Sequence, residues 1–116
     1  MKDNLIVDLT YQFALQVIDL CKSIRTKKEY ELASQLWRAG TSIGANVEEA
    51  QAGQSRADFR SKMSIAAKEA HETHYWLRLA RDAQVLTHEQ LAPALECAGQ
   101  IQRVLTSIVK STSENP

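Results

Sequence analysis

The chain has 116 residues, a length typical of one domain, and its 14 Lys and Arg residues balance its 14 Asp and Glu residues. Eight residues of each sign fall in residues 1–60 and six of each sign in residues 61–116, so the basic block typical of phosphate-binding proteins is missing from the composition. The N-terminal segment lacks the apolar run of a signal peptide, and no segment approaches the about 18 apolar residues of a membrane span, so we expect a cytoplasmic protein with no membrane contact.

Apolar residues recur at spacings of three and four, which is typical of amphipathic helices, and never alternate as in a strand. The first predicted helix spans residues 5–25. Thr26 and Glu29 fit a capping box, so the second predicted helix spans residues 29–52, with Gly53 as its stop. The predicted core stripes are Leu5, Leu9, Phe13, Val17, Leu20 and Ile24 in the first helix, and Leu32, Leu36, Gly40, Ile43, Val47 and Ala50 in the second.

Ser55 is the expected N-cap of a third helix over residues 56–84. Thr87 and Gln90 fit another capping box, but Pro93 prefers a first turn, so the fourth helix is placed at residues 90–111. The stripes here are Phe59, Met63, Ala66, Ala70, Thr73, Leu77 and Ala80, then Leu91, Leu95, Ala98, Ile101, Leu105 and Ile108. Four amphipathic helices with short loops predict one all-α domain over residues 1–116, an antiparallel up-down-up-down four-helix bundle.

Two features exceed what an isolated bundle needs. The second helix is rich in small residues, and each glycine inside a helix costs about 1 kcal/mol relative to alanine. Close approach of another backbone is the favoured explanation for Gly40 and Gly44, with a ligand or a bent helix as alternatives. The third helix carries a second apolar stripe with Ile65, Trp76 and Leu79, and Trp37 lies outside the stripe of its own helix. A helix that is apolar on two sides is buried on two sides, which predicts self-association; a broad core-facing arc is the alternative.

A polar stripe also follows the second helix, formed by Arg38, Ser42, Asn46 and Glu49. Arg38 and Glu49 are too far apart on one helix to pair, so each needs a partner from another helix or subunit. The stripe is interpreted either as a solvated face or as a hydrogen-bonding seam that fixes the register between subunits, with an active site as a third alternative.

No residue set in the sequence amounts to a catalytic or metal site, so we expect no enzymatic activity and no cofactor. Cys21 and Cys97 each lie in an apolar helical pattern and are expected to be free thiols, with a disulfide as the alternative. His71 and His74 are three residues apart, unlike the HExxH spacing of zinc proteases, and surface or interface histidines are favoured over metal ligands.

A basic cluster lies at the turn between the first two predicted helices. Its members are Lys22, Arg25, Lys27 and Lys28. The cluster is either a solvated turn whose cations favour the C-terminus of the first helix or a contact for nucleic acid.

The segment from Gln35 to Phe59 resembles the signature of the four-helix-bundle family named after the 23S rRNA intervening sequence. The positions that carry the resemblance are Arg38, Ala39, Ser42, Ile43, Asn46, Val47, Glu49, Ser55, Asp58 and Phe59, together with Glu72 in the third helix. Ala50 stands where the family usually has glycine, and His71 and His74 are not part of its pattern. The resemblance implies a four-helix protomer, a ring-like homopentamer and no established enzymatic activity. The chain is also similar to accessory variability proteins of diversity-generating retroelements, which implies nucleic acid or a nucleic-acid enzyme as a partner.

The leading prediction is therefore a non-enzymatic, self-assembling interaction protein whose main partner is itself. Its interface or structural polar seam is predicted to contain Trp37, Arg38, Ser42, Asn46, Glu49, Glu72 and Trp76. The alternative is a nucleic-acid-binding accessory factor that acts as a homo-oligomer.

Overall fold

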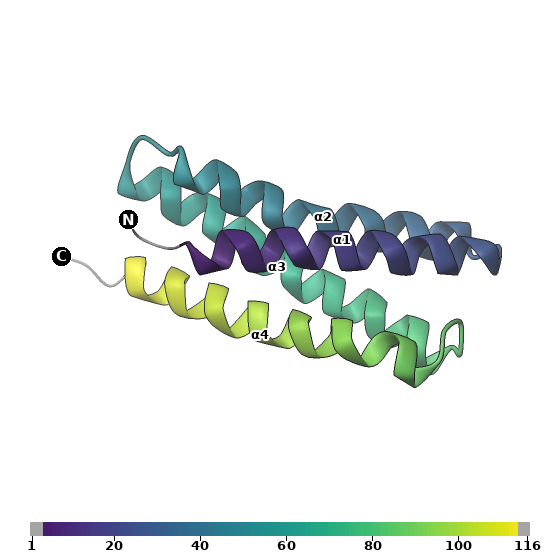
Figure 1. The fold of residues 1–116 in the computed structure, drawn as a ribbon. Helices are drawn as coiled ribbons and strands as arrows, with labels where there is room; N and C mark the ends of the chain where they lie inside the picture. Colours follow the sequence, from purple (N-terminus) through teal and green to yellow (C-terminus); the bar gives the residue numbers. More distant parts are fainter. Residues whose placement is uncertain (1–3, 114–116) are drawn as a thin grey trace.

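The structure is a computed structural model that describes residues 4–113, and over that range it contains four α-helices and no strand. The helices are α1 (Leu5–Thr26), α2 (Tyr30–Gln51), α3 (Arg56–Asp82) and α4 (His88–Ser113). The four helices lie side by side, with α1 and α3 each in contact with α2 and α4 (Figure 1). The beginning of α1, the end of α4 and the α2–α3 connection share one end of the bundle, and the other two turns share the opposite end (Figure 1). The predicted all-α, four-helix fold is confirmed.

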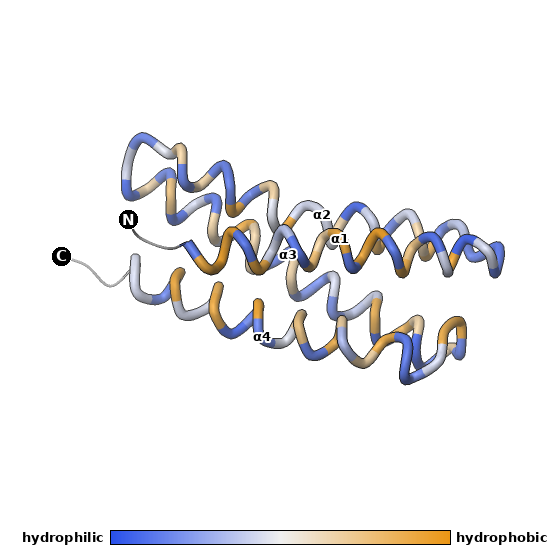
Figure 2. Tube along the Cα trace, viewed as in Figure 1, coloured by the Kyte–Doolittle hydropathy of each residue, from blue (hydrophilic) through white to orange (hydrophobic). Residues whose placement is uncertain are grey.

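The core forms where the apolar stripes of the four helices meet, and hydrophobic segments recur along every helix (Figure 2). Nearly all predicted core positions of α2, α3 and α4 are buried, and the remaining ones, Leu32, Phe59, Leu95 and Ile108, are half-buried against the core. The 3-4 periodicity therefore locates the inner face of these three helices correctly.

The predicted stripe of α1 is wrong at Leu5 and less deeply buried than expected at Leu9 and Leu20. Leu5 is 73% exposed, and Leu9 and Leu20 are only partly buried. The inner positions belong instead to Ile6, Thr10 and Cys21, beside the correctly predicted Phe13, Val17 and Ile24. Burial of Thr10 costs little because its hydroxyl donates to the Ile6 carbonyl at 2.8 Å.

The glycines of α2 allow α1 to approach closely. A Cβ added at Gly40 would lie 2.6 Å from Cγ1 of Val17, and one at Gly44 would lie 3.3 Å from the backbone oxygen of Thr10. The predicted close approach of another backbone is therefore confirmed, and the neighbour is α1 of the same chain.

Two of the three predicted helix caps are present. The Ser55 hydroxyl accepts from the Asp58 N–H at 3.0 Å, while Thr87 and Gln90 exchange reciprocal backbone–side-chain bonds of 2.9 and 3.1 Å. Because this capping box is intact, α4 begins at His88 rather than residue 90 and tolerates Pro93 inside the helix. The capping box at Thr26 is wrong, since Thr26 still belongs to α1 and its hydroxyl donates to the Ser23 carbonyl at 2.6 Å.

Helices α1 and α3 end in the same way, in a Schellman motif that a non-glycine residue closes. Lys28 and Gln84 take left-handed φ values of 63° and 61°. The N–H after each one reaches back to the helix, from Glu29 to Ile24 at 3.4 Å and from Val85 to Ala80 at 2.9 Å. Gly53 was predicted to play this part for α2, but its φ is not positive.

Cys21 and Cys97 are free thiols, as predicted. Over residues 4–113, none of the helices combines the length and apolarity that crossing a membrane requires.

Candidate interaction site on helices α2 and α3

A cluster of charged side chains joins the middle of α2 to α3. Arg38 extends from α2 and forms ion pairs with two carboxylates of α3, Glu69 at 3.3 Å and Glu72. The Glu72 carboxylate also accepts from the indole N–H of Trp76 at 3.0 Å. The partner predicted for Arg38 therefore lies on another helix of the same chain, and the structure brings three of the predicted residues together.

The rest of the polar stripe is also paired within the chain. Glu49 meets Lys62 of α3 at 2.8 Å. The Asn46 side-chain amide donates to the Ser42 carbonyl at 2.9 Å and to the Ser42 hydroxyl at 3.2 Å. Exposed ion pairs contribute only about 0–1 kcal/mol to stability, so these pairs chiefly fix side-chain positions along the α2–α3 seam.

Apolar side chains surround this cluster on the outside of the bundle. Ile65 is 39% exposed and Leu79 is 37% exposed, on either side of the half-buried Trp76. The ring of Tyr75 packs edge-on against Trp76, with 5.0 Å between the ring centroids. This is the second apolar stripe that the sequence predicts on α3, and the structure leaves it uncovered by the protomer.

A groove of about 680 Å³ continues the apolar surface between the start of α2 and the end of α3. We call it the α2/α3 groove. Leu32, Trp76, Leu79 and Val85 supply its apolar side chains, and its remaining lining residues are Glu29, Glu31, Ser34, Gln35 and Ala83. The lining contains two carboxylates and no cation, while the exposed Lys27 and Lys28 lie on the adjoining α1–α2 turn.

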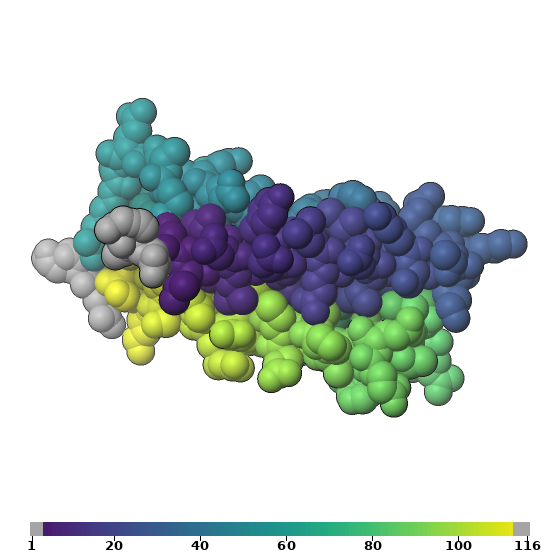
Figure 3. Space-filling view, in the orientation of Figure 1, coloured from purple at the N-terminus to yellow at the C-terminus, as the bar shows by residue number. Residues whose placement is uncertain are grey.

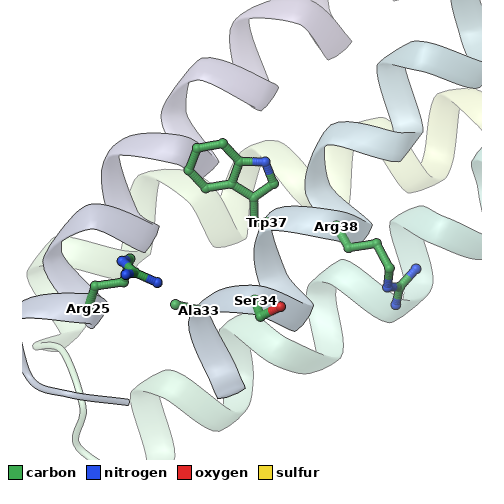
Figure 4. A pocket seen from close by; sticks show the side chains of 5 residues that line it. All are labelled: Arg25, Ala33, Ser34, Trp37 and Arg38. Atoms are coloured by element: carbon green, nitrogen blue, oxygen red, sulfur yellow. The ribbon is translucent and has the colours of Figure 1, made fainter. Parts of the chain in front are cut away.

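Trp37 lies next to Arg38 in sequence but points to the side of α2 that faces α1. It lines a second hollow with Arg25, Ala33, Ser34 and Arg38. Figure 4 shows that the side chains of Trp37 and Arg38 leave α2 in different directions. Trp37 and Trp76 therefore line two neighbouring hollows, which share Ser34 and are joined through Arg38 and Glu72.

The basic cluster occupies the α1–α2 turn. Lys22, Arg25, Lys27 and Lys28 are all exposed, and the Arg25 guanidinium lies over the Tyr30 ring at 5.2 Å. Lys27 also lines a hollow with Arg81 and His88 from the α3–α4 turn. Positive side chains from both turns thus meet at this end of the bundle.

Of the two histidines of α3, His71 contacts α4 and His74 lies near two arginines of its own helix. The Gln102 amide nitrogen is 3.0 Å from Nδ1 of His71. Burial lowers the pKa of His74, and the nearby charges of Arg78, Arg81 and His71 lower it further. Among residues 4–113 the structure contains no group of three or more His, Cys, Asp or Glu side chains arranged to hold a metal ion.

Sequence reasoning missed two residues of the site, Glu69 and Lys62. Both lie with Trp76 at seven-residue spacing along α3. That spacing places them on the side of α3 that faces the polar stripe of α2. The seven-residue spacing is the feature of the sequence from which both residues could have been predicted.

Comparisons with known proteins agree on a family and leave the activity open. The model of the family described as "23S rRNA-intervening sequence protein" matches residues 2–107. A crystal structure from Bacteroides thetaiotaomicron, described as a protein of unknown function from the S23 ribosomal protein family, is 42% identical. The similarity covers 90% of this chain and 98% of that one, with a TM-score of 0.87. The comparison with curated proteins finds no match.

Proposed function

The chain belongs to the 23S rRNA-intervening sequence protein family, and from this premise we propose that it is a non-enzymatic cytoplasmic protein that assembles with copies of itself into an interaction scaffold. The protomer of this proposal is an up-down-up-down bundle, and the assembly is a homo-oligomeric ring with five protomers favoured. Trp37 and the α2–α3 seam supply the subunit contacts.

The observation that carries the proposal is the uncovered surface of α3 beside the Arg38 cluster. Ile65, Tyr75 and Leu79 are exposed next to Trp76, and the α2/α3 groove extends this apolar area. Aromatic residues and arginine are the types enriched in protein interfaces, and they are most effective where a partner excludes water.

The ion pairs along the α2–α3 seam would become stronger in such an assembly. In one protomer the Arg38 side chain is 50% exposed, so water weakens its pairing with Glu72. A covering subunit would remove that water and strengthen the ion pairs, while the Arg38 cluster, with one cation and two carboxylates, keeps one net negative charge for the partner to meet. Preformed pairs also cost less side-chain ordering on association.

Light scattering coupled to size-exclusion chromatography tests the proposal at micromolar protein concentrations. The wild-type chain is expected to have a mass of several protomers. Leu79→Asp buries a charge in the interface and is expected to shift the mass towards one protomer, whereas Gln100→Asp, an equal charge change on exposed α4, leaves it unchanged. A wild-type mass equal to that of one protomer contradicts the proposal.

A second candidate function is nucleic-acid binding by the assembled ring, as an accessory factor to a nucleic-acid enzyme. The four exposed cations of the α1–α2 turn favour it, because a ring would repeat them around one rim. Binding to labelled RNA and DNA, followed by fluorescence anisotropy, should weaken steeply with salt and weaken again in Lys27→Ala/Lys28→Ala. Undetectable binding at low salt rules this candidate out.

A further inference from the structure

The outward side of α1 carries a ridge of large side chains that the protomer leaves open. Tyr11, Leu15, Ile18 and Lys22 follow one another at spacings of four, three and four, which places them on one side of the helix. We call this set the α1 ridge. Tyr11 is 55% exposed and Leu15 is 45% exposed, and Figure 3 shows α1 uncovered along the front of the molecule, between α2 and α4.

The α1 ridge and the α2/α3 groove have complementary shapes. The ridge is a convex row on a single helix, whereas the groove is a hollow between two helices with apolar side chains in its lining. A second groove could not fill this hollow, because close packing requires a protruding surface opposite a concave one. A helix laid into a groove is a recurring mode of recognition that uses anchors at this spacing.

The charges at the two surfaces favour one direction of the helix. Lys22 stands at the C-terminal end of the α1 ridge, and Glu29 and Glu31 stand at the end of the groove near the turn. Placing Lys22 beside the two glutamates directs Asp8, which lies at the other end of α1, towards the half-exposed Arg38 and its two carboxylate partners. Asp19 beside Lys22, and Lys27 and Lys28 beside the two glutamates, reduce this preference. The opposite direction would bring Asp8 to the two glutamates.

We propose that the α2/α3 groove of one protomer receives the α1 ridge of a second copy of this chain. The inference rests on the proposed self-assembly and specifies its contact. Because the two surfaces are different, each protomer offers one ridge and one groove. Such a head-to-tail contact forms a ring when the rotation between neighbours closes, and an open filament when it does not.

Two variants that each lack one surface test this contact. Leu15→Asp removes the ridge and keeps the groove, whereas Leu79→Asp removes the groove and keeps the ridge. Gln12→Asp on α1 and Gln100→Asp on α4 are the matched controls, since both place the same new charge at an exposed polar position. Circular dichroism establishes that every variant is folded, and light scattering measures the mass of each variant alone and of equimolar mixtures.

The inference predicts that Leu15→Asp and Leu79→Asp are each monomeric, and that their mixture forms a dimer with one protomer of each kind. The dimer arises because the intact ridge of one variant can enter the intact groove of the other, and no third protomer can join. The inference is overturned if Leu15→Asp alone keeps the wild-type mass, or if the mixture stays monomeric. A monomeric wild-type chain would instead refute self-assembly itself, so the two failures are distinct.

Discussion

Replacing Gly40 by alanine tests whether close packing of α1 and α2 explains this glycine. The added methyl carbon would lie 2.6 Å from Cγ1 of Val17. Carbon atoms in good contact are about 3.5–4.0 Å apart, so the two helices or the valine must shift by about 1 Å. Overpacking of this kind costs about 1–3 kcal/mol, while alanine gains about 1 kcal/mol in helix propensity. We therefore expect Gly40→Ala to lower the free energy of unfolding by about 0–2 kcal/mol.

Gly99→Ala is the matched control, because the nearest atom to its added Cβ is an Arg103 side-chain nitrogen at an ordinary 3.5 Å. This variant should gain up to about 1 kcal/mol, since only the propensity changes. Urea unfolding followed by circular dichroism, at one fixed protomer concentration, measures both variants. If Gly40→Ala were stabilised as much as Gly99→Ala, close packing at Gly40 would be the wrong explanation.

A double-mutant cycle sharpens this test. Val17→Ala alone removes buried methyl groups and leaves a cavity, whereas in the presence of Ala at position 40 the new methyl occupies part of that space. The two substitutions should therefore be coupled favourably, by about 1 kcal/mol or more. Strict additivity would show that the two side chains do not compete for the same volume.

Three further predictions concern the helix ends and the titrating groups. Gln84→Gly should raise the melting temperature, because a left-handed conformation costs a non-glycine residue about 1–2 kcal/mol. The larger unfolded-state entropy of glycine offsets part of this gain. A lower melting temperature would contradict the prediction. Burial raises the pKa of Cys21 to about 11, so iodoacetamide at neutral pH should label the more exposed Cys97 first and Cys21 only on unfolding, as peptide mass spectrometry can determine. Because the pKa of His74 is lowered in the folded chain, the unfolded chain binds a proton at this residue more readily. The free energy of unfolding should therefore fall as the pH drops through about 6.5 and below. His74→Gln should make that fall shallower in unfolding experiments.

The sequence predicts the inner faces of α2, α3 and α4 well because their periodicity is unambiguous. Helix α1 is different, since Leu5, Leu9, Tyr11 and Leu15 make it apolar on more than one side. Hydropathy then favours leucine at the core positions. Packing instead selects Thr10, whose backbone approaches Gly44 of α2.

The helix ends show a second limit of sequence reasoning. Rules for helix termination look for glycine, and they selected Gly53, whereas the left-handed residues are Lys28 and Gln84. In both turns the backbone bonds of the Schellman motif and the packing of the chain that follows outweigh the intrinsic cost of the conformation. The Arg38 cluster could be predicted only in part. The sequence of α2 reveals its polar stripe, but it does not show which carboxylates of α3 pair with Arg38.

The four contacts between helices also suggest an order of folding. Contacts of α2 with α3 join neighbouring segments across a short loop, so they form at little entropic cost. Contacts between α1 and α4 join the two ends of the chain and are less extensive than the other three. The α2–α3 hairpin, with the Arg38 cluster in place, can thus form early like the other two hairpins, whereas the contact between α1 and α4 closes last and is the first to separate.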